Sequence, residues 1–219
     1  MNDKRHAFER DPITVTWSQR RCIHAAECVR RLPEVFRPGE RPWIQLEPAT
    51  ADAVAEVVMR CPTGALQFTR SDGGALEAVP DANLVMVSPS GPLYLRGDIE
   101  AIAPDGSVLV RDTRVALCRC GMSANKPFCD NTHRQAGFSD PGVIHNEDSV
   151  EDLGASGRTL RVGPTVNGPL HLEGPFTLAS ADASTMLTGT DAWLCRCGKS
   201  QSKPFCDGSH SAGFEAEGV

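Results

Sequence analysis

Alternating apolar and polar residues predict short strands near both ends of the first third of the chain. Residues 13–17 (ITVTW) and 66–69 (LQFT) have the two-residue period of half-buried strands. Between them, the apolar residues of segment 51–60 recur at helical spacing, and Thr50 stands where a helix N-cap is expected. This part of the chain is therefore expected to combine strands with a helix.

The remainder of the chain has a β pattern that occurs twice. GPLYLRG at 91–97 is echoed by GPLHLEG at 168–174, and short alternating segments follow at 107–110 and 191–194. The turn residues between these segments are typical of strands joined by tight connections. We expect a duplication in which each copy is a small β-structure.

Each copy ends in a block that is rich in metal-binding side chains. The blocks read CRCGMSANKPFCDNTH at 118–133 and CRCGKSQSKPFCDGSH at 195–210. Each supplies three thiols and one imidazole, which exceeds what packing would need and predicts a metal centre in each block. The candidate ligands are Cys118, Cys120, Cys129 and His133 in the first block and Cys195, Cys197, Cys206 and His210 in the second.

Zinc is the first alternative, because three Cys and one His form a known structural zinc set. Structural zinc sites, however, usually place two to four residues between paired ligands. Here one Arg separates the first two Cys, so both side chains point to the same side of an extended segment and can reach one iron of a two-iron cluster. The later Cys and the His, four residues apart, could hold the other iron.

The complete pattern, C-x-C-x2-S-x3-P-x-C-D-[GN]-[ST]-H, resembles that of the CDGSH iron–sulfur (mitoNEET-like) family. The first copy departs from it only in Asn131, which replaces Gly and tolerates positive φ well. The resemblance implies one 2Fe–2S cluster per motif, with the three Cys and the His as ligands. Lys126 and Lys203, three residues before the third Cys of each motif, are expected to lie near the cluster and tune it, and Asp130 and Asp207 to cap the turn that carries the His.

The remaining cysteines, Cys22, Cys28 and Cys61, predict a third site. Bacterial ferredoxins place ligands as C-x2-C-x2-C with a distant C-P, and here Ala25 occupies the middle position. Residues 12–70 resemble the divergent single-cluster ferredoxin domain. Three Cys suit a 3Fe–4S cluster, or a 4Fe–4S cluster with another ligand at its fourth iron. His24 is the candidate for that ligand, and the alternative is a solvated loop histidine.

These patterns predict an α+β protein. We expect a small ferredoxin-like α+β domain at 1–76, followed by a duplicated, β-rich CDGSH unit at 77–145 and 146–219 whose halves form an intramolecular pseudo-dimer. Such a fused pair would bury in one monomer the face that single-motif relatives bury by dimerising. Because units this small have limited cores, metal ligation is expected to contribute much of their stability.

Charge is distributed unevenly along the chain. The net charge is −6, but the residues through Arg70 hold eleven Lys and Arg against nine Asp and Glu, so the rest is strongly acidic. An acidic chain with few aromatic residues disfavours a nucleic-acid partner. The arginines beside the first ligands could form a basic rim that attracts an acidic redox partner, or could be ordinary solvated residues: Arg20, Arg21, Arg30, Arg31 and Arg60.

The compartment follows from the cysteines and the apolar pattern. An odd number of Cys and an N-terminus without an apolar run argue against a secreted disulfide framework. No apolar stretch approaches the ~20 residues that span a bilayer. A reducing cytoplasm without a membrane partner is expected, since thiolate ligands persist there.

No catalytic constellation stands out, and the histidines outside the blocks (His6, His145 and His171) stand alone. We therefore expect an electron carrier rather than an enzyme, with protein redox partners. The N-terminal cluster is expected to have the lower potential, because replacement of thiolate by imidazole raises it at the CDGSH sites. Two alternatives remain: an iron–sulfur cluster donor or redox/iron sensor, which would need apo-protein acceptors, and a subunit of an enzyme encoded elsewhere.

Overall fold

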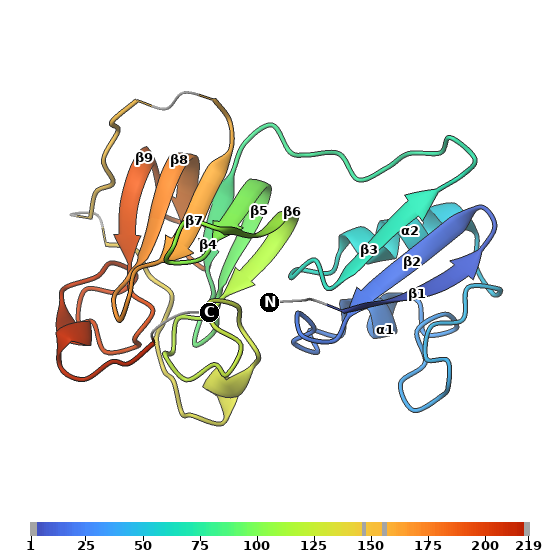
Figure 1. Ribbon diagram of the computed structural model, residues 1–219, viewed down its shortest axis with the longest axis horizontal. Coiled ribbons are helices and arrows are strands. Elements are labelled where there is room, and N and C mark those ends of the chain that lie inside the picture. Colours follow the sequence, from blue (N-terminus) through green and yellow to red (C-terminus); the bar gives the residue numbers. More distant parts are fainter. Residues whose placement is uncertain (1–3, 146–147, 155–156, 217–219) are drawn as a thin grey trace. The chain divides into compact units, whose positions relative to one another are not determined.

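The computed structural model describes residues 4–145, 148–154 and 157–216. The chain forms two compact units, one running through Ala78 and the other beginning at Val79 (Figure 1). Residues 71–83, which join them, contain neither helix nor strand.

The N-terminal unit is a three-stranded antiparallel sheet with two helices. The sheet order is β1 (Arg5–Arg10), β2 (Ile13–Ser18), β3 (Leu66–Arg70), and the helices are α1 (Glu27–Arg31) and α2 (Ala51–Met59). The two strands and the helix predicted from periodicity are confirmed, and the Thr50 hydroxyl accepts from the Ala53 N–H at 3.3 Å. Strand β1 was not expected, because its charged sequence lies at the edge of the sheet with little burial.

The core of this unit lies between the sheet and α2. Apolar residues of β2 and α2 are fully buried there, and Trp43 packs against the rings of Phe8, Trp17 and Phe36. This packing fixes the segments on either side of the loop that contains Cys22 and Cys28.

The C-terminal unit is built on one six-stranded sheet. Its strands are β4 (Leu84–Val87), β5 (Leu93–Ile102), β6 (Val108–Leu117), β7 (Leu160–Pro164), β8 (Leu170–Ala179) and β9 (Met186–Leu194). Short 3₁₀ turns, Thr132–Arg134 and Ser209–Ser211, follow β6 and β9. The unit is thus almost entirely β, and Figure 1 shows both cysteine-rich loops at the same end of the sheet.

The two repeats share this sheet by exchanging their first strands. Strand β4 is antiparallel to β5 of its own repeat and parallel to β8 of the other, with Leu84 opposite Thr177. Strand β7 does the converse: it is antiparallel to β8 and parallel to β5, with Arg161 opposite Glu100. The second and third of the three segments expected from the sequence therefore lie in one compact unit.

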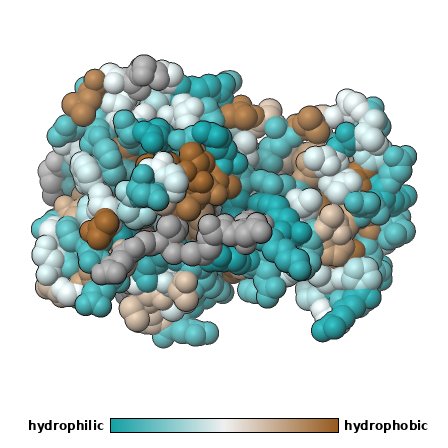
Figure 2. Space-filling view, in the orientation of Figure 1, coloured by the Kyte–Doolittle hydropathy of each residue, from teal (hydrophilic) through white to brown (hydrophobic). Residues whose placement is uncertain are grey.

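A single hydrophobic core supports both repeats. It contains buried residues from all six strands, and Phe128 and Phe205 of the cysteine-rich loops pack against it. The Pro-Phe pairs of the motifs therefore attach the loops to the sheet. In the view of Figure 2 the surface is largely hydrophilic, with small hydrophobic patches between polar residues.

Candidate metal centres

The first cysteine-rich loop begins where β6 ends and folds back on it. The Cys118 N–H donates to the Pro127 carbonyl at 2.8 Å, and the Cys129 N–H donates to the Ala116 carbonyl at 3.0 Å. These bonds bring both ends of the loop to the same strand terminus. The Sγ atoms of Cys118 and Cys120 lie 3.6 Å apart and are buried.

The second half of this loop forms another close pair. Cys129 Sγ lies 3.5 Å from His133 Nδ1, and both residues are buried. The Asp130 carboxylate accepts from the N–H groups of Ala124 and Thr132 and so shapes the turn that carries the histidine. Asn131 has φ 77°, the conformation for which Asn is the best substitute for Gly.

The second loop repeats this geometry at the end of β9. Cys195 and Cys197 have Sγ atoms 3.7 Å apart, and Cys206 Sγ lies 3.3 Å from His210 Nδ1. Asp207 takes the place of Asp130, accepting from the backbone of Gln201 and Ser209. The second site differs in exposure, because Cys206 and His210 are only partly buried.

The ligands are arranged in two pairs per loop rather than around one point. In the described part of the chain, no three His, Cys, Asp or Glu side chains converge closely enough to hold a single metal ion. A tetrahedral zinc would need all four ligands around one centre. Two close pairs are compatible with a cluster of two irons in which each iron takes one pair.

Backbone N–H groups point at several of the sulfur atoms. Met122 donates to Cys120 Sγ, Asn131 to Cys129 Sγ and Lys199 to Cys197 Sγ, each at 3.4 Å. Such donors favour the charged thiolate, which is the form that binds metal.

Without metal, burial opposes that ionisation. It raises the pKa of the Cys129 thiol to about 11 and also raises the pKa of Cys195. Burial lowers the pKa of His133, which keeps its imidazole neutral and able to bind a metal. Metal binding therefore has to displace thiol protons, as in other thiolate sites.

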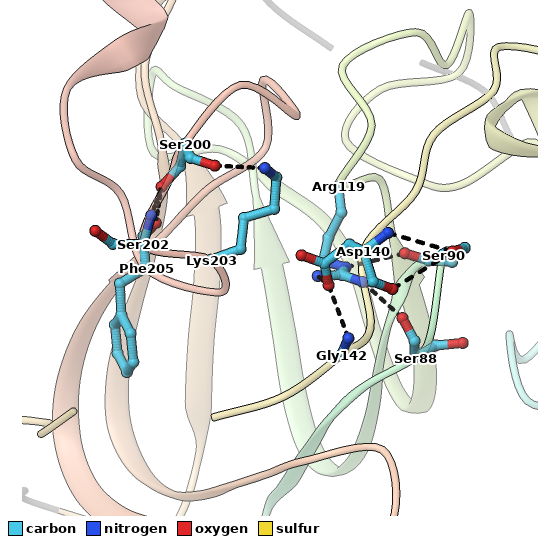
Figure 3. Close-up of polar contacts among 10 residues, drawn as sticks. Ser88, Ser90, Arg119, Asp140, Gly142, Ser200, Ser202, Lys203 and Phe205 are labelled. Carbon is cyan, nitrogen blue, oxygen red and sulfur yellow. Dashed lines mark hydrogen bonds and ion pairs between the residues drawn. The ribbon is translucent and has the colours of Figure 1, made fainter. Parts of the chain in front are cut away.

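The two motif lysines bond to their own loops. Lys126 Nζ donates to the Ser123 carbonyl at 2.6 Å, and Lys203 Nζ donates to the Ser200 carbonyl (Figure 3). The serine hydroxyls in turn donate to the carbonyls of Phe128 and Phe205, at 2.7 Å in both loops. The lysines thus close the loops, and a direct role in tuning the cluster stays a prediction.

Two buried arginines, whose role was not evident from the sequence, lie behind the loops. Arg119 Nε donates to the Gly91 carbonyl at 3.0 Å, and its Nη1 forms an ion pair with Asp140 at 2.6 Å (Figure 3). Arg196 likewise donates to the Gly168 carbonyl at 2.7 Å. These bonds join each loop to the GPL segment of its own repeat. The sequence contained an indication of this contact, because the GPL segment and the arginine between the first two cysteines are both repeated at the same spacing.

The N-terminal cysteines face one cavity of about 570 Å³. Cys22, Cys28 and Cys61 line it, as do His24 and Ala25. Burial, and next the neighbouring Cys61, raises the pKa of Cys28 to about 11. Three thiols on one cavity fit a cluster with three cysteine ligands. His24 is exposed at the same cavity with φ 53°, so the loop presents it there without identifying it as a ligand.

Four of the five arginines beside the first ligands bond to neighbouring groups: Arg21, Arg30, Arg31 and Arg60. Arg21 is buried and donates to the Thr63 carbonyl. Arg30 and Arg31 both form ion pairs with Glu27. Arg60 pairs with Glu56, so Glu27 and Glu56 compensate two of the five positive charges, and a basic rim stays a prediction.

His171 does not stand alone, contrary to expectation. Its Nε2 lies 2.6 Å from the Asp191 carboxylate, and its ring stacks on Trp193 with centroids 4.0 Å apart. These residues come from neighbouring strands, β8 and β9, whose register could not be read from the sequence.

Comparison with known proteins agrees with these sites. The family described as "Iron-binding zinc finger CDGSH type" matches residues 90–134 and 167–211, and "Divergent 4Fe-4S mono-cluster" matches residues 8–71. The chain is 31% identical over 58 residues to "Uncharacterized protein YjdI" of Escherichia coli K12 and equally to that of strain O157:H7, covering 76% of each relative and 26% of this chain. No solved structure matches.

The helices of the described residues are all too short or too polar to traverse a bilayer. Both matched families bind iron, and the matches coincide with the three cysteine groups. The chain therefore carries two units of the CDGSH iron-binding family in tandem behind a divergent 4Fe–4S mono-cluster domain.

Proposed function

We propose that this protein is a multi-cluster iron–sulfur protein that acts in electron transfer. Each CDGSH loop would hold one 2Fe–2S cluster through its three Cys and its His, and the N-terminal cavity would hold a 3Fe–4S or 4Fe–4S cluster through Cys22, Cys28 and Cys61. The observation that carries the proposal is the grouping of the CDGSH ligands into close pairs, 3.3–3.7 Å apart, on two rigidly supported loops.

Such clusters, when bound, accept and release single electrons. The chain's own contribution is to hold its thiolates in place, to donate N–H groups to them and to shield them from water. The histidines contribute a neutral ligand in place of a thiolate, which leaves each CDGSH site one charge less negative. This charge difference supports a higher potential at the CDGSH sites than at the N-terminal site.

An electron carrier is favoured over an enzyme by the surroundings of the sites. The cysteine-rich loops are filled by their own Phe, Ser and Lys side chains, and the buried arginines behind them bond to backbone carbonyls. His171 and Asp191 form a His–carboxylate pair between β8 and β9, and the His171 ring is covered by Trp193.

The exchange of β4 and β7 supports a monomer. Each repeat completes the other's sheet within one chain, which is the role a second subunit would otherwise have. The halves of the C-terminal unit would then form an internal pseudo-dimer, and protein redox partners in the cytoplasm would exchange electrons with it.

Cluster transfer to apo-proteins is the second candidate function. It is favoured by one observation, the partial exposure of Cys206 and His210 at the second site. A ligand pair reached by water can be protonated and released more readily than a buried one. Transfer would then start from the second site.

Iron and sulfide analysis of anaerobically purified protein, with EPR during a redox titration, tests the proposal. We expect roughly seven or eight irons per chain and two separable potentials, the lower one assigned to the N-terminal site. Zinc alone, or no metal, would contradict the cluster assignment. Rapid iron transfer to an apo-ferredoxin, with slow electron exchange, would favour the second candidate.

A further inference from the structure

The two cysteine-rich loops of the C-terminal unit touch each other through their glycines. A Cβ atom placed on Gly121 would lie 2.6 Å from the Cys197 carbonyl oxygen of the other loop. A Cβ on Gly198 would lie 2.8 Å from the Cys120 carbonyl oxygen. The contact is reciprocal, since each glycine directly follows one of these cysteines.

Both contacts are with backbone atoms rather than with the end of a flexible side chain. Gly121 and Gly198 have φ of +78° and +80°, a region that side chains other than Gly strain to adopt. The atoms that a side chain would meet are main-chain carbonyl groups. Each turn therefore leaves no space for a side chain at the glycine of the other turn.

The same turns determine where the sulfur atoms lie. Cys120 Sγ accepts from Met122 N–H, and Cys197 Sγ accepts from Lys199 N–H, so each turn contains a metal ligand, the glycine and the donor to that ligand. A shift of one turn would displace the carbonyl of the facing cysteine and with it that sulfur.

A buried arginine fixes the second of these loops from behind. Arg196 donates to the Gly168 and Thr165 carbonyls, both at 2.7 Å.

We propose that each CDGSH site is completed by the opposite repeat: Gly121 positions Cys197, Gly198 positions Cys120, and the two sites consequently take up metal together. This inference rests on the proposed function, because it presupposes that both loops bind clusters. It adds that neither site is an independent module, although each contains its own four ligands.

The first test follows the wild-type chain during reconstitution. The apo-protein is given iron and sulfide in substoichiometric amounts, and native mass spectrometry counts the clusters on each chain. Coupled sites should give chains with neither or both CDGSH clusters, with singly loaded chains well below the share that random filling gives. A singly loaded population at the random level at half saturation would overturn the coupling.

The second test uses Gly121→Ala in the full chain, with iron content and far-UV circular dichroism as readouts. We expect loss of roughly four irons, from both sites, because two irons belong to each 2Fe–2S cluster. Loss of roughly two irons would show a purely local effect and overturn the inference. Gly198→Ala, which places the added methyl group in the second loop instead of the first, should also cause the loss of both clusters.

Matched controls separate the contact from backbone strain. Gly137 and Gly213 have φ of +65° and +85°, but a Cβ there would meet nothing within 4 Å. Gly137→Ala and Gly213→Ala should therefore keep both clusters. Failure of wild-type protein to bind any cluster in either loop would refute the proposed function itself, whereas two clusters that fill independently would refute the coupling alone.

Discussion

Arg119 and Asp140 form a buried ion pair behind the first metal site, with Nη1 and Oδ1 2.6 Å apart. The arginine side chain is 1% exposed and the aspartate 9%. Asp140 also accepts from the Gly142 N–H at 2.9 Å, as Figure 3 shows. In the second repeat the corresponding Nη1 of Arg196 is buried without a hydrogen-bond partner, and Nη2 donates to the Ala216 carbonyl at 3.2 Å. Within the described chain the two sites therefore differ by one buried negative charge.

Asp140→Ala should strongly destabilise the C-terminal unit. Removal of one partner leaves the Arg119 guanidinium buried without its counter-charge, and such changes cost about 3–5 kcal/mol. Chemical denaturation monitored by circular dichroism measures the free energy of unfolding. As a control, Glu173→Ala breaks an exposed pair with Arg161 in the same unit and should cost less than about 1 kcal/mol. Equal costs for the two variants would contradict this assignment.

Asn83→Ala should weaken the strand exchange between the repeats. The Asn83 amide donates to the Arg158 and Pro175 carbonyls at 2.6 and 2.7 Å, and its oxygen accepts from the Asp98 N–H at 2.7 Å. Loss of these three buried bonds is expected to cost about 2–4 kcal/mol. Thermal unfolding should shift accordingly, while Gln201→Ala, an exposed amide in the same unit, should leave it nearly unchanged.

Much of the local structure could be predicted from the sequence. Helix α2 was predictable because its apolar period and its Thr50 cap agree, and β2 and β3 because their alternation is clear. The candidate metal ligands stood out because Cys and His at these spacings have no packing explanation, and the structure brings them into close pairs. Local chemistry of this kind depends on residues a few positions apart.

The arrangement of the repeats could not be predicted in the same way. The pairing of β4 with β8 depends on residues such as Leu84 and Thr177, which are far apart along the chain. The residues around Gly121 predict a turn, but they do not indicate that this turn faces Cys197 of the other repeat. The buried ion pair of Arg119 with Asp140 could not be predicted either, because the sequence does not distinguish a buried arginine from a solvated one.

Ala25→Cys should change the nuclearity or stability of the N-terminal cluster. Ala25 lines the cavity that also contains Cys22, Cys28 and Cys61, at the position where ferredoxins carry a ligand. A fourth thiol there should favour 4Fe–4S, visible as loss of any 3Fe–4S EPR signal and slower loss of iron in air. Ala26→Cys, which also adds a thiol to the cavity wall, is the control and should not have this effect. If both variants responded identically, residue 25 would not be the specific position at which a fourth cluster ligand is missing.

Removal of iron should disorder the cysteine-rich loops but leave the sheet of the C-terminal unit folded. The small size of the repeats predicted that metal ligation contributes much of their stability, and hence that loss of iron unfolds them. The two repeats, however, share one continuous core that includes the fully buried Leu93, Leu95, Leu170 and Leu172. The loops, in contrast, contain mostly turns and metal ligands. After chelation, we expect the β circular dichroism signal to persist and protease to cut within 118–138 and 195–214. Complete loss of that signal would show that the clusters stabilise the whole unit.

Acidification should release metal from the second CDGSH site before the first. A histidine must be neutral to bind metal, so ligation stabilises each site above the pKa of its imidazole and is lost as the pH falls through that value. Burial lowers the pKa of His133, which extends the stable range of the first site to lower pH, whereas His210 is more open to solvent. His210→Cys should slow the decay of visible absorbance at mildly acidic pH more than His133→Cys does. Unchanged decay in His210→Cys would show that the imidazole is not the weak point.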